Sequence, residues 1–280
     1  QIKIKKIPLI LLNARITKKT FSKWNTVPKT AKEIFSNFDL CLSSSIQTQE
    51  YLQKLNVKNI KYLGNLKLAG EVIIDNKAPI INKGLNERLF WCALSTHNKE
   101  NLFCLNVHRI LKNTFSNLTT IIIPRHINKV KSVQSICKKL NLENQILSND
   151  EKIDENKDII IINSYGNTSK YLNLCKSVFI GKSLIKKLKN VAGQNPIEAA
   201  KLGCKIYSGP YIYNFQEIYE LLKKNDISEI INSENELSNK LSIDFKTTNK
   251  DKDTKIKRIN DLGDKILLET HSEINKILIK

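Results

Sequence analysis

The sequence predicts an α/β fold in which parallel strands alternate with helices. Between residues 88 and 222, short apolar runs alternate with stretches of helical character, which is typical of a doubly wound parallel sheet. The clearest unit runs from Ser177 to Phe215, where an apolar run, a glycine-containing loop, a helix start and a second apolar run follow one another. No run approaches the roughly 18 apolar residues that a membrane-spanning helix needs.

Composition narrows the classes of partner. The chain has 280 residues, 41% of them hydrophobic, which suits one large or two modest domains. A formal net charge of +19, almost wholly from Lys, favours acidic partners such as nucleotides, anionic lipid or nucleic acid. No aromatic-basic interleaving and no helix-turn-helix pattern supports nucleic acid. The six cysteines form no C-x-x-C pair, which indicates core thiols and argues against a metal site. Because the chain contains no Met, we expect a fragment or processed form that has lost its start.

The segment from Ser177 onward carries the strongest local signals. Val178–Ile180 predicts a buried strand that ends at Gly181. Asn195 is a typical N-cap, and Pro196 suits the first helical position. The start of a helix in a lysine-rich neighbourhood attracts anions. Glu198 then has two interpretations: it accepts from the Asn195 N–H in a capping box, or it accepts from a ribose diol beside a bound phosphate.

The remaining elements follow from the same patterns. Apolar runs predict the other strands at Ile7–Leu12, Asp39–Leu42, Ile60–Leu63, Arg88–Leu94, Thr119–Ile123, Asp158–Ile162 and Cys204–Tyr207. Helical patterns predict the principal helices at Ala31–Phe38, Ser44–Leu55, Leu102–Phe115, Asn128–Leu140, Thr168–Leu174, Phe215–Lys224 and Ser233–Leu241. We expect a loop over Asp244–Asp253, followed by a long amphipathic helix over Lys255–Ile279 that Gly263 interrupts weakly.

Several short motifs resemble one family. Residues 181–184 are GKSL, residues 192–203 are AGQNPIEAAKLG, and residues 209–215 have the pattern GP-x-x-x-NF. These segments resemble the GGSL, GGHNPLEPAALG and GP-x-x-x-NF elements of the 3-deoxy-D-manno-octulosonate (Kdo) transferases of lipopolysaccharide synthesis. The segments N-A-R at 13–15, G-N-L-K at 64–67, S-T-H at 95–97 and P-R-H at 124–126 resemble further motifs of that family.

The resemblance implies a fold and a function. The fold is the α/β GT-B type, with two Rossmann-like domains of which the amino-terminal one is incomplete. We expect residues 1–68 to be the remainder of the acceptor-side domain, 69–86 a linker, 87–245 the nucleotide-sugar domain, and 246–280 a terminal helix that crosses back to the first domain. The implied function is the transfer of Kdo from CMP-Kdo to a lipid A precursor (lipid IVA), without a cofactor or metal. The implied place is the cytoplasmic face of the inner membrane, peripheral or anchored by a missing amino-terminal segment, with an anionic membrane surface as partner and no nucleic acid.

The resemblance also implies a donor site. Its residues are Ser95, Thr96, His97, Pro124, Arg125, His126, Tyr165, Gly166, Ser183, Asn195 and Glu198. Arg125 is suited to neutralise phosphate or stack on cytosine, while Arg15 and Lys67 resemble residues near the cleft of the first domain. Taken alone, Arg15 is better explained as a surface Arg at a helix start. A lone His97 is likewise better explained as an exposed His at a capped helix start, and only the motif context favours a binding role.

The catalytic base is unknown from the sequence. In the family it is a Glu in the early amino-terminal part, which this chain lacks, so we expect this fragment alone to be inactive. If the base lies within these residues, Glu100 and His97 are the first candidates.

This chain departs from the family pattern at several positions. Lys99 and Asn101 replace a Gly and the second Glu of S-T-H-x-G-E-E, and Ile162, Asn163 and Asn167 replace three residues of G-D-x-x-G-E-L. The loss of acidic residues leaves the nucleotide preference open. A UDP-sugar-dependent GT-B transferase and a non-catalytic nucleotide-binding fragment therefore remain as alternatives.

Overall fold

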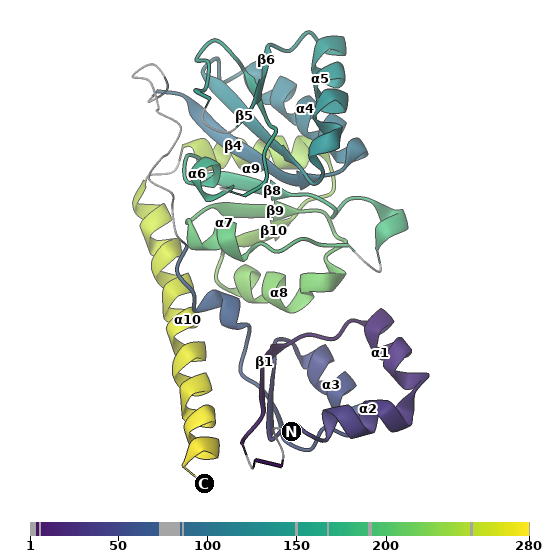
Figure 1. Cartoon of the computed structure of the whole chain (residues 1–280). Coiled ribbons are helices and arrows are strands. Elements are labelled where there is room, and N and C mark those ends of the chain that lie inside the picture. The colour runs from purple at the N-terminus through teal and green to yellow at the C-terminus, as the bar shows by residue number, and fades with distance from the viewer. Residues whose placement is uncertain are drawn as a thin grey trace. The chain divides into compact units, whose positions relative to one another are not determined.

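The chain folds into two compact units in a computed structural model (Figure 1). The structure describes residues 4–5, 7–72, 85, 87–148, 151–166, 168–189, 192–246 and 249–279. Unit 1 comprises Gln1–Glu71 and Ile259–Lys280, and unit 2 comprises Val72–Arg258. Most of the predicted linker over residues 69–86 lies outside the described residues.

Unit 1 contains a three-stranded parallel sheet in the order β1-β2-β3. Its strands are β1 (Ile10–Ala14), β2 (Leu40–Ser43) and β3 (Ile60–Tyr62), and its helices are α1 (Lys18–Asn25), α2 (Pro28–Phe35), α3 (Ile46–Lys54) and the 3₁₀ turn η1 (Leu66–Leu68). The Thr17 and Ser45 side chains cap α1 and α3 by accepting from backbone N–H groups of the first turn. Ala31, Phe35 and Leu52 pack from the helices into a small apolar core.

Two predicted motifs of unit 1 meet at the carboxyl end of its sheet. Asn13, in the left-handed region at φ +50°, accepts a hydrogen bond at Oδ1 from the Leu66 N–H at 3.1 Å. Arg15 and Lys67, the predicted cleft residues, are both exposed next to this junction. The side-chain amide of Asn13, near the end of β1, therefore links the N-A-R segment to the G-N-L-K segment.

The last helix, α10 (Asn249–Leu278), is longer than predicted. The predicted loop over Asp244–Asp253 is wrong at both ends, because α9 (Glu234–Phe245) extends through Phe245 and α10 begins at Asn249. Gly263 does not interrupt the helix. A Cβ there would lie 2.2 Å from the Leu68 carbonyl oxygen, so a glycine allows the helix to pass close to η1.

Unit 2 is built on a seven-stranded sheet in which every strand pair is parallel. The strand order is β10-β9-β8-β4-β5-β7-β6. The strands are β4 (Leu89–Thr96), β5 (Leu118–Pro124), β6 (Asn144–Leu147), β7 (Ile159–Ile162), β8 (Ser177–Ile180), β9 (Lys205–Ser208) and β10 (Ser228–Ile230). The predicted doubly wound parallel sheet is confirmed. The two edge strands, β6 and β10, were not predicted, since their short sequences lack a continuous apolar run.

Helices cover both faces of this sheet (Figure 1). The helices are α4 (Asn98–Lys112), α5 (Val130–Lys139), α6 (Thr168–Leu172), α7 (Ile197–Lys201), α8 (Gln216–Lys224) and α9, with 3₁₀ turns at Ile127–Lys129, Lys186–Leu188 and Tyr213–Phe215. Helices α4, α5 and α9 pack together against β4, β5 and β7, while α6 and α7 pack together on the opposite face.

The core of unit 2 explains why its strands were recognisable. Trp91, Ile122 and Phe179 are fully buried between the helix layers, as are their neighbours along each central strand. A strand covered on both faces needs apolar residues at every position, which produces the continuous runs seen in the sequence. All six cysteines are buried and unpaired, so the prediction of core thiols is confirmed. Among the described residues, no helix is both long and apolar enough to cross a membrane.

Candidate functional site

The S-T-H and P-R-H motifs lie side by side at the carboxyl ends of two adjacent strands. Thr96, at the end of β4, is in register with Pro124, at the end of β5. The Arg125 N–H donates to the Thr96 carbonyl at 3.0 Å. The rings of His97 and His126 are nearly perpendicular, with centroids 6.0 Å apart. Ligands of open parallel sheets bind at this edge.

These motifs border a cavity of about 270 Å³, which we call the strand-end cavity. Its lining residues are Thr96, His97, Lys99, His126, Lys129 and Ile185. Thr96 is only 2% exposed, and its Oγ1 has no hydrogen-bond partner among the described residues. The Nε2 of His97 is likewise buried and unpartnered within the described chain. Because buried polar atoms are normally paired, two such atoms beside one cavity point to a polar ligand.

The electrostatics of the cavity favour an anion. Burial of the His97 ring is the main cause that lowers its pKa below 6.5, and the neighbouring Lys182, His126 and Arg125 lower it further, while Glu100 acts in the opposite direction. Neutral His97 presents one N–H donor and one acceptor at pH 7. Lys99 and Lys129 add positive charge to the wall.

The Glu100 carboxylate accepts hydrogen bonds from four backbone N–H groups of the site. Its carboxylate is 1% exposed and accepts from the backbone N–H groups of Lys182 at 2.7 Å, Ser183 at 2.8 Å, Leu184 at 3.0 Å and His97 at 3.0 Å. Three successive N–H groups that converge on an anion form a backbone nest. Lys182 makes this possible by adopting φ +57°. The candidate role of Glu100 as a base is disfavoured, because four backbone donors already occupy its oxygens.

Ser183 is turned into the protein. It is fully buried, and its Oγ donates to the Ile180 carbonyl at 2.6 Å. Ser183 Oγ also accepts from the Gly209 N–H at 2.9 Å. A Cβ at Gly209 would lie 2.3 Å from the Ser183 carbonyl oxygen. The hydroxyl therefore joins the loop after β8 to the loop after β9, and its predicted contact with a donor stays a prediction.

Glu198 has a partner that the sequence did not indicate. Its Oε1 accepts from the Thr168 hydroxyl at 2.7 Å, which links α7 to α6. The capping box does not form: α7 starts at Ile197, and the Asn195 side chain accepts from the Ile197 N–H at 3.1 Å. With five residues, α7 has a smaller dipole than the predicted longer helix. The half-buried carboxylate of Glu198 remains beside the predicted anion-binding segment.

The other predicted donor residues are less enclosed. Tyr165 is 69% exposed, Gly166 is exposed, and Asn167 lies outside the described residues. Ser95 is half-buried at φ +56°, inside β4, where the pairing with β5 shifts register between Leu94 and Thr96. Arg125 and His126 are exposed at the end of β5.

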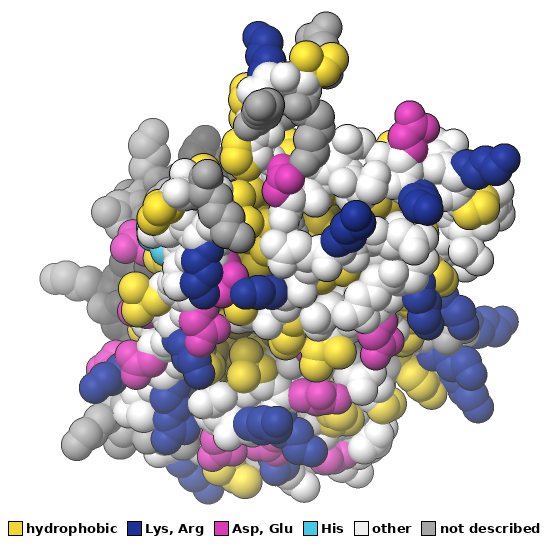
Figure 2. Space-filling model, turned by 90° about the horizontal axis from the view of Figure 1, so that it is seen from below, with side chains coloured by type: hydrophobic (Ala, Val, Ile, Leu, Met, Phe, Trp, Pro, Cys, Tyr) yellow, Lys and Arg dark blue, Asp and Glu magenta, His cyan; other side chains and the backbone are white. Residues whose placement is uncertain are grey.

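The face shown in Figure 2 carries charges of both signs. On the face shown in Figure 2, Lys and Arg side chains alternate with Asp and Glu and do not gather into one patch. Among the described residues, no three His, Cys, Asp or Glu side chains are grouped to hold a metal ion.

The chain has a fold of the α/β GT-B type, as predicted. The structure is similar to that of the carboxyl-terminal CMP-Kdo binding domain of WaaA from Acinetobacter baumannii, with a TM-score of 0.55 and 23% identity over 65% of this chain and 91% of that one. It is also similar to Anabaena HepE in complex with UDP, with a TM-score of 0.60 and 11% identity over 98% of this chain and 74% of that one. At these identities the two structures support the fold alone.

Sequence comparison confirms the resemblance to the Kdo transferases. Residues 1–69 match the family model described as 3-deoxy-D-manno-octulosonic-acid transferase (kdotransferase). The chain is 27% identical to the 3-deoxy-D-manno-octulosonic acid transferase of Haemophilus influenzae over 79% of this chain and 52% of that protein. It is 30% identical to that of Rickettsia typhi over 82% of this chain and 49% of that protein. The chain thus spans about half the length of these curated relatives.

Proposed function

We propose that this chain carries the donor-binding part of a Kdo transferase and binds CMP-Kdo in unit 2. The observation that supports this most directly is the pair of buried, unpartnered polar atoms, Thr96 Oγ1 and His97 Nε2, beside the strand-end cavity. They stand at the carboxyl edge of a parallel sheet, where nucleotides bind in open α/β folds. The named relatives agree with this reaction class.

Each group of the site has a chemical role in the proposal. CMP is the leaving group of the transfer, so its phosphate charge needs cations or N–H donors in place before the bond breaks. Arg125 and the lysines of the cavity wall supply cations, and the Thr96 hydroxyl and His97 imidazole supply directional hydrogen bonds. Glu198 accepts from the ribose hydroxyls, with Thr168 holding the carboxylate in place.

The proposal extends to the whole reaction. The acceptor is a lipid A precursor, the reaction takes place at the cytoplasmic face of the inner membrane, and no cofactor or metal takes part. Proton removal from the acceptor hydroxyl requires a general base, which in our proposal is not Glu100.

Calorimetric titration of the chain with CMP and with UMP tests the donor assignment. We expect CMP to bind more tightly than UMP, and Thr96→Val to weaken CMP binding by roughly tenfold through one lost hydrogen bond to a charged ligand. Thr114→Val, at an exposed position of the same unit, is the matched control. Absent CMP binding, or equal binding of CMP and UMP, would count against the proposal.

A further inference from the structure

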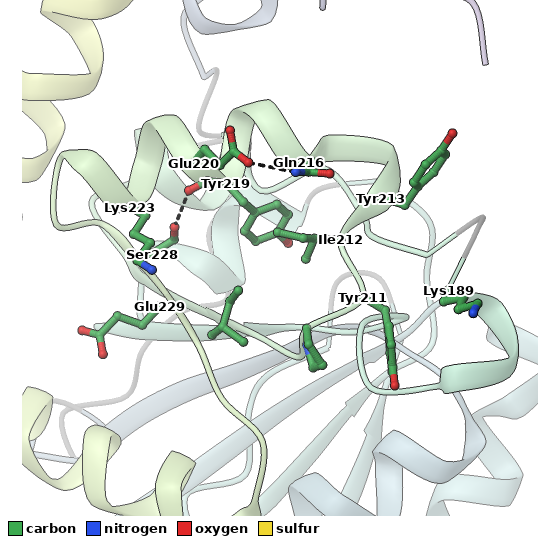
Figure 3. Close-up of a pocket in the computed structure, with 12 residues that line it drawn as sticks. Lys189, Tyr211, Ile212, Tyr213, Gln216, Tyr219, Glu220, Lys223, Ser228 and Glu229 are labelled. Carbon is green, nitrogen blue, oxygen red and sulfur yellow. Dashed lines mark hydrogen bonds between the residues drawn. The ribbon is translucent and has the colours of Figure 1, made fainter. Parts of the chain in front are cut away.

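Unit 2 contains further cavities besides the strand-end cavity. The cavity of about 600 Å³ between the loop after β9, helix α8 and strand β10 has part of the GP-x-x-x-NF segment in its wall (Figure 3), so it belongs with the family motifs. A separate cavity of about 430 Å³, which we call the α4–α9 cavity, lies between helix α4 and the first residue of α9. It shares no lining residue with the strand-end cavity, and neither the sequence motifs nor the proposed donor site include its residues.

One face of α4 forms most of the wall of this cavity. Its lining residues Asn106, Arg109, Ile110 and Asn113 occupy positions i, i+3, i+4 and i+7, which lie on one side of a helix. Glu234, the first residue of α9, completes the lining. Helices α4 and α9 pack against each other, so the fold sets the spacing between the two parts of the wall.

The carboxylate of Glu234 is held in place. Its Oε1 accepts from Asn106 Nδ2 at 2.9 Å, across the two helices. The backbone beside it is fixed by Ser233, whose hydroxyl accepts from the Glu236 N–H at 3.1 Å and caps α9. The other oxygen, Oε2, accepts no hydrogen bond from a residue that the structure describes. Because a carboxylate has about four acceptor sites, Glu234 keeps the capacity to bind a cationic group.

Arg109 brings an unpaired positive charge to the same cavity. Its guanidinium forms no hydrogen bond and no ion pair with any described residue, whereas Arg88 of the same unit pairs with Asp158 at 2.9 Å. The forked N–H donors of an arginine match the two oxygens of a carboxylate. Arg109 and Glu234 therefore line one cavity without pairing with each other, and a ligand that carries both a negative and a positive group can pair with both.

We propose that the α4–α9 cavity binds a free α-amino acid with an aliphatic side chain. The carboxylate of the ligand pairs with Arg109 and its ammonium group with Glu234, since both groups of an amino acid are charged at pH 7. The aliphatic side chain packs on Ile110, which is 37% exposed. The volume falls in the range of about 300–1,000 Å³ that is usual for small-molecule sites. The proposal does not rest on the donor assignment, because the two cavities have separate walls.

Titration of the chain by NMR tests this site with leucine and two analogues that each lack one charge. Leucinamide has no carboxylate, and N-acetylleucine has no ammonium group. We expect leucine to bind and to shift the backbone amide signals of residues 106–113. Each analogue should bind roughly tenfold more weakly, because it loses one hydrogen-bonded ion pair.

Variants assign each charge of the ligand to one side chain. Arg109→Gln and Glu234→Gln should each weaken leucine binding by roughly tenfold. Arg109→Gln should leave leucinamide binding unchanged, since that analogue has no carboxylate to lose a partner, and Glu234→Gln should likewise leave N-acetylleucine binding unchanged. Lys138→Gln and Glu155→Gln, which remove one charge of each sign at exposed positions of unit 2, are the matched controls and should bind leucine as the wild type does.

Thermal melting of each variant reports whether it is folded, independently of any ligand. Equal binding of leucine and either analogue would overturn the proposal. So would unchanged leucine affinity in a folded Arg109→Gln or Glu234→Gln variant, or the absence of leucine binding to the wild type. CMP titration is a separate measurement, so a failure of the donor assignment leaves this test intact.

Discussion

A carboxylate oxygen of Glu100 lies 2.8 Å from the backbone nitrogen of Ser183, 83 positions further along the chain. Together with Lys182 and Leu184, this contact closes a backbone nest around the carboxylate. Such nests are familiar binding sites for phosphate. Here an acidic side chain of the protein occupies the nest, so these three N–H groups already have an acceptor within the chain.

Removing the charge of Glu100 should therefore destabilise unit 2. In Glu100→Gln one acceptor oxygen becomes an N–H₂ donor that faces backbone N–H groups, and we expect a loss of about 3 kcal/mol in the free energy of unfolding. Urea denaturation measures the loss, with the exposed Glu155→Gln as control. A stable Glu100→Gln would show that the carboxylate does not hold the loop.

The left-handed backbone at Lys182 predicts an unusual order of stabilities. At φ +57° an L-residue costs roughly 1–2 kcal/mol, so Lys182→Gly should be more stable than Lys182→Ala by about that amount. At Lys186, which is not among the positive-φ residues, the order should reverse, because Gly is about 0.5–1 kcal/mol less favourable than Ala. Thermal melting of the four variants makes the comparison. The same order at both positions would contradict the prediction.

Close packing at the end of β8 predicts that Gly181 cannot be enlarged. A Cβ there would lie 2.6 Å from both the Ser95 carbonyl oxygen and the Thr96 Cα. We expect Gly181→Ala to cost about 2 kcal/mol and to weaken CMP binding, because the S-T-H loop must shift. Gly70→Ala, where nothing lies within 4 Å, is the control and should be nearly neutral. Wild-type stability in Gly181→Ala would refute this account of the strand ends.

His108 predicts a loss of stability in mild acid. It is fully buried, its Nδ1 lies 2.8 Å from the Thr120 hydroxyl, and burial lowers its pKa from 6.5 to about 4. The unfolded state therefore binds the proton more readily, so stability is complete above about pH 6.5 and falls as the pH drops toward 4. The loss is at most about 3 kcal/mol.

Urea unfolding of wild type and His108→Gln at pH 7 and pH 5 measures this effect. The difference in stability between the two pH values should shrink in the variant. An identical pH dependence in wild type and His108→Gln would rule out the buried imidazole as its source.

Variants of Thr168 and Glu198, which share a hydrogen bond, distinguish a ribose-binding role of Glu198 from a structural one. If Glu198 accepts from ribose, Glu198→Gln should weaken CMP binding by about 1.5–3 kcal/mol, the range for a hydrogen bond to a charged group. Thr168→Val removes the 2.7 Å hydrogen bond but keeps the carboxylate, so it should weaken CMP less. Calorimetry and thermal melting are compared on the same samples. Unchanged affinity with a lowered melting temperature in Glu198→Gln would refute the ribose role.

Local sequence patterns were sufficient to predict an element where successive residues share the same kind of environment. The central strands of unit 2 were predicted because burial on both faces demands unbroken apolar runs such as Ile159–Ile162. The edge strands β6 and β10 were missed, because one open side permits polar residues there. The start of α10 was missed because its first residues, from Asn249 to Asp253, are all polar or charged and show no apolar periodicity.

The sequence by itself determined the parallel α/β architecture and the core cysteines, since continuous apolar runs mark strands that are covered on both faces. Only the tertiary structure decided the partners of individual side chains. Glu100 turned out to hold the loop after β8, Ser183 to face the interior, and Glu198 to pair with Thr168. These contacts join residues far apart in sequence or depend on single backbone angles such as φ at Lys182, and neither leaves a periodic signal in the chain.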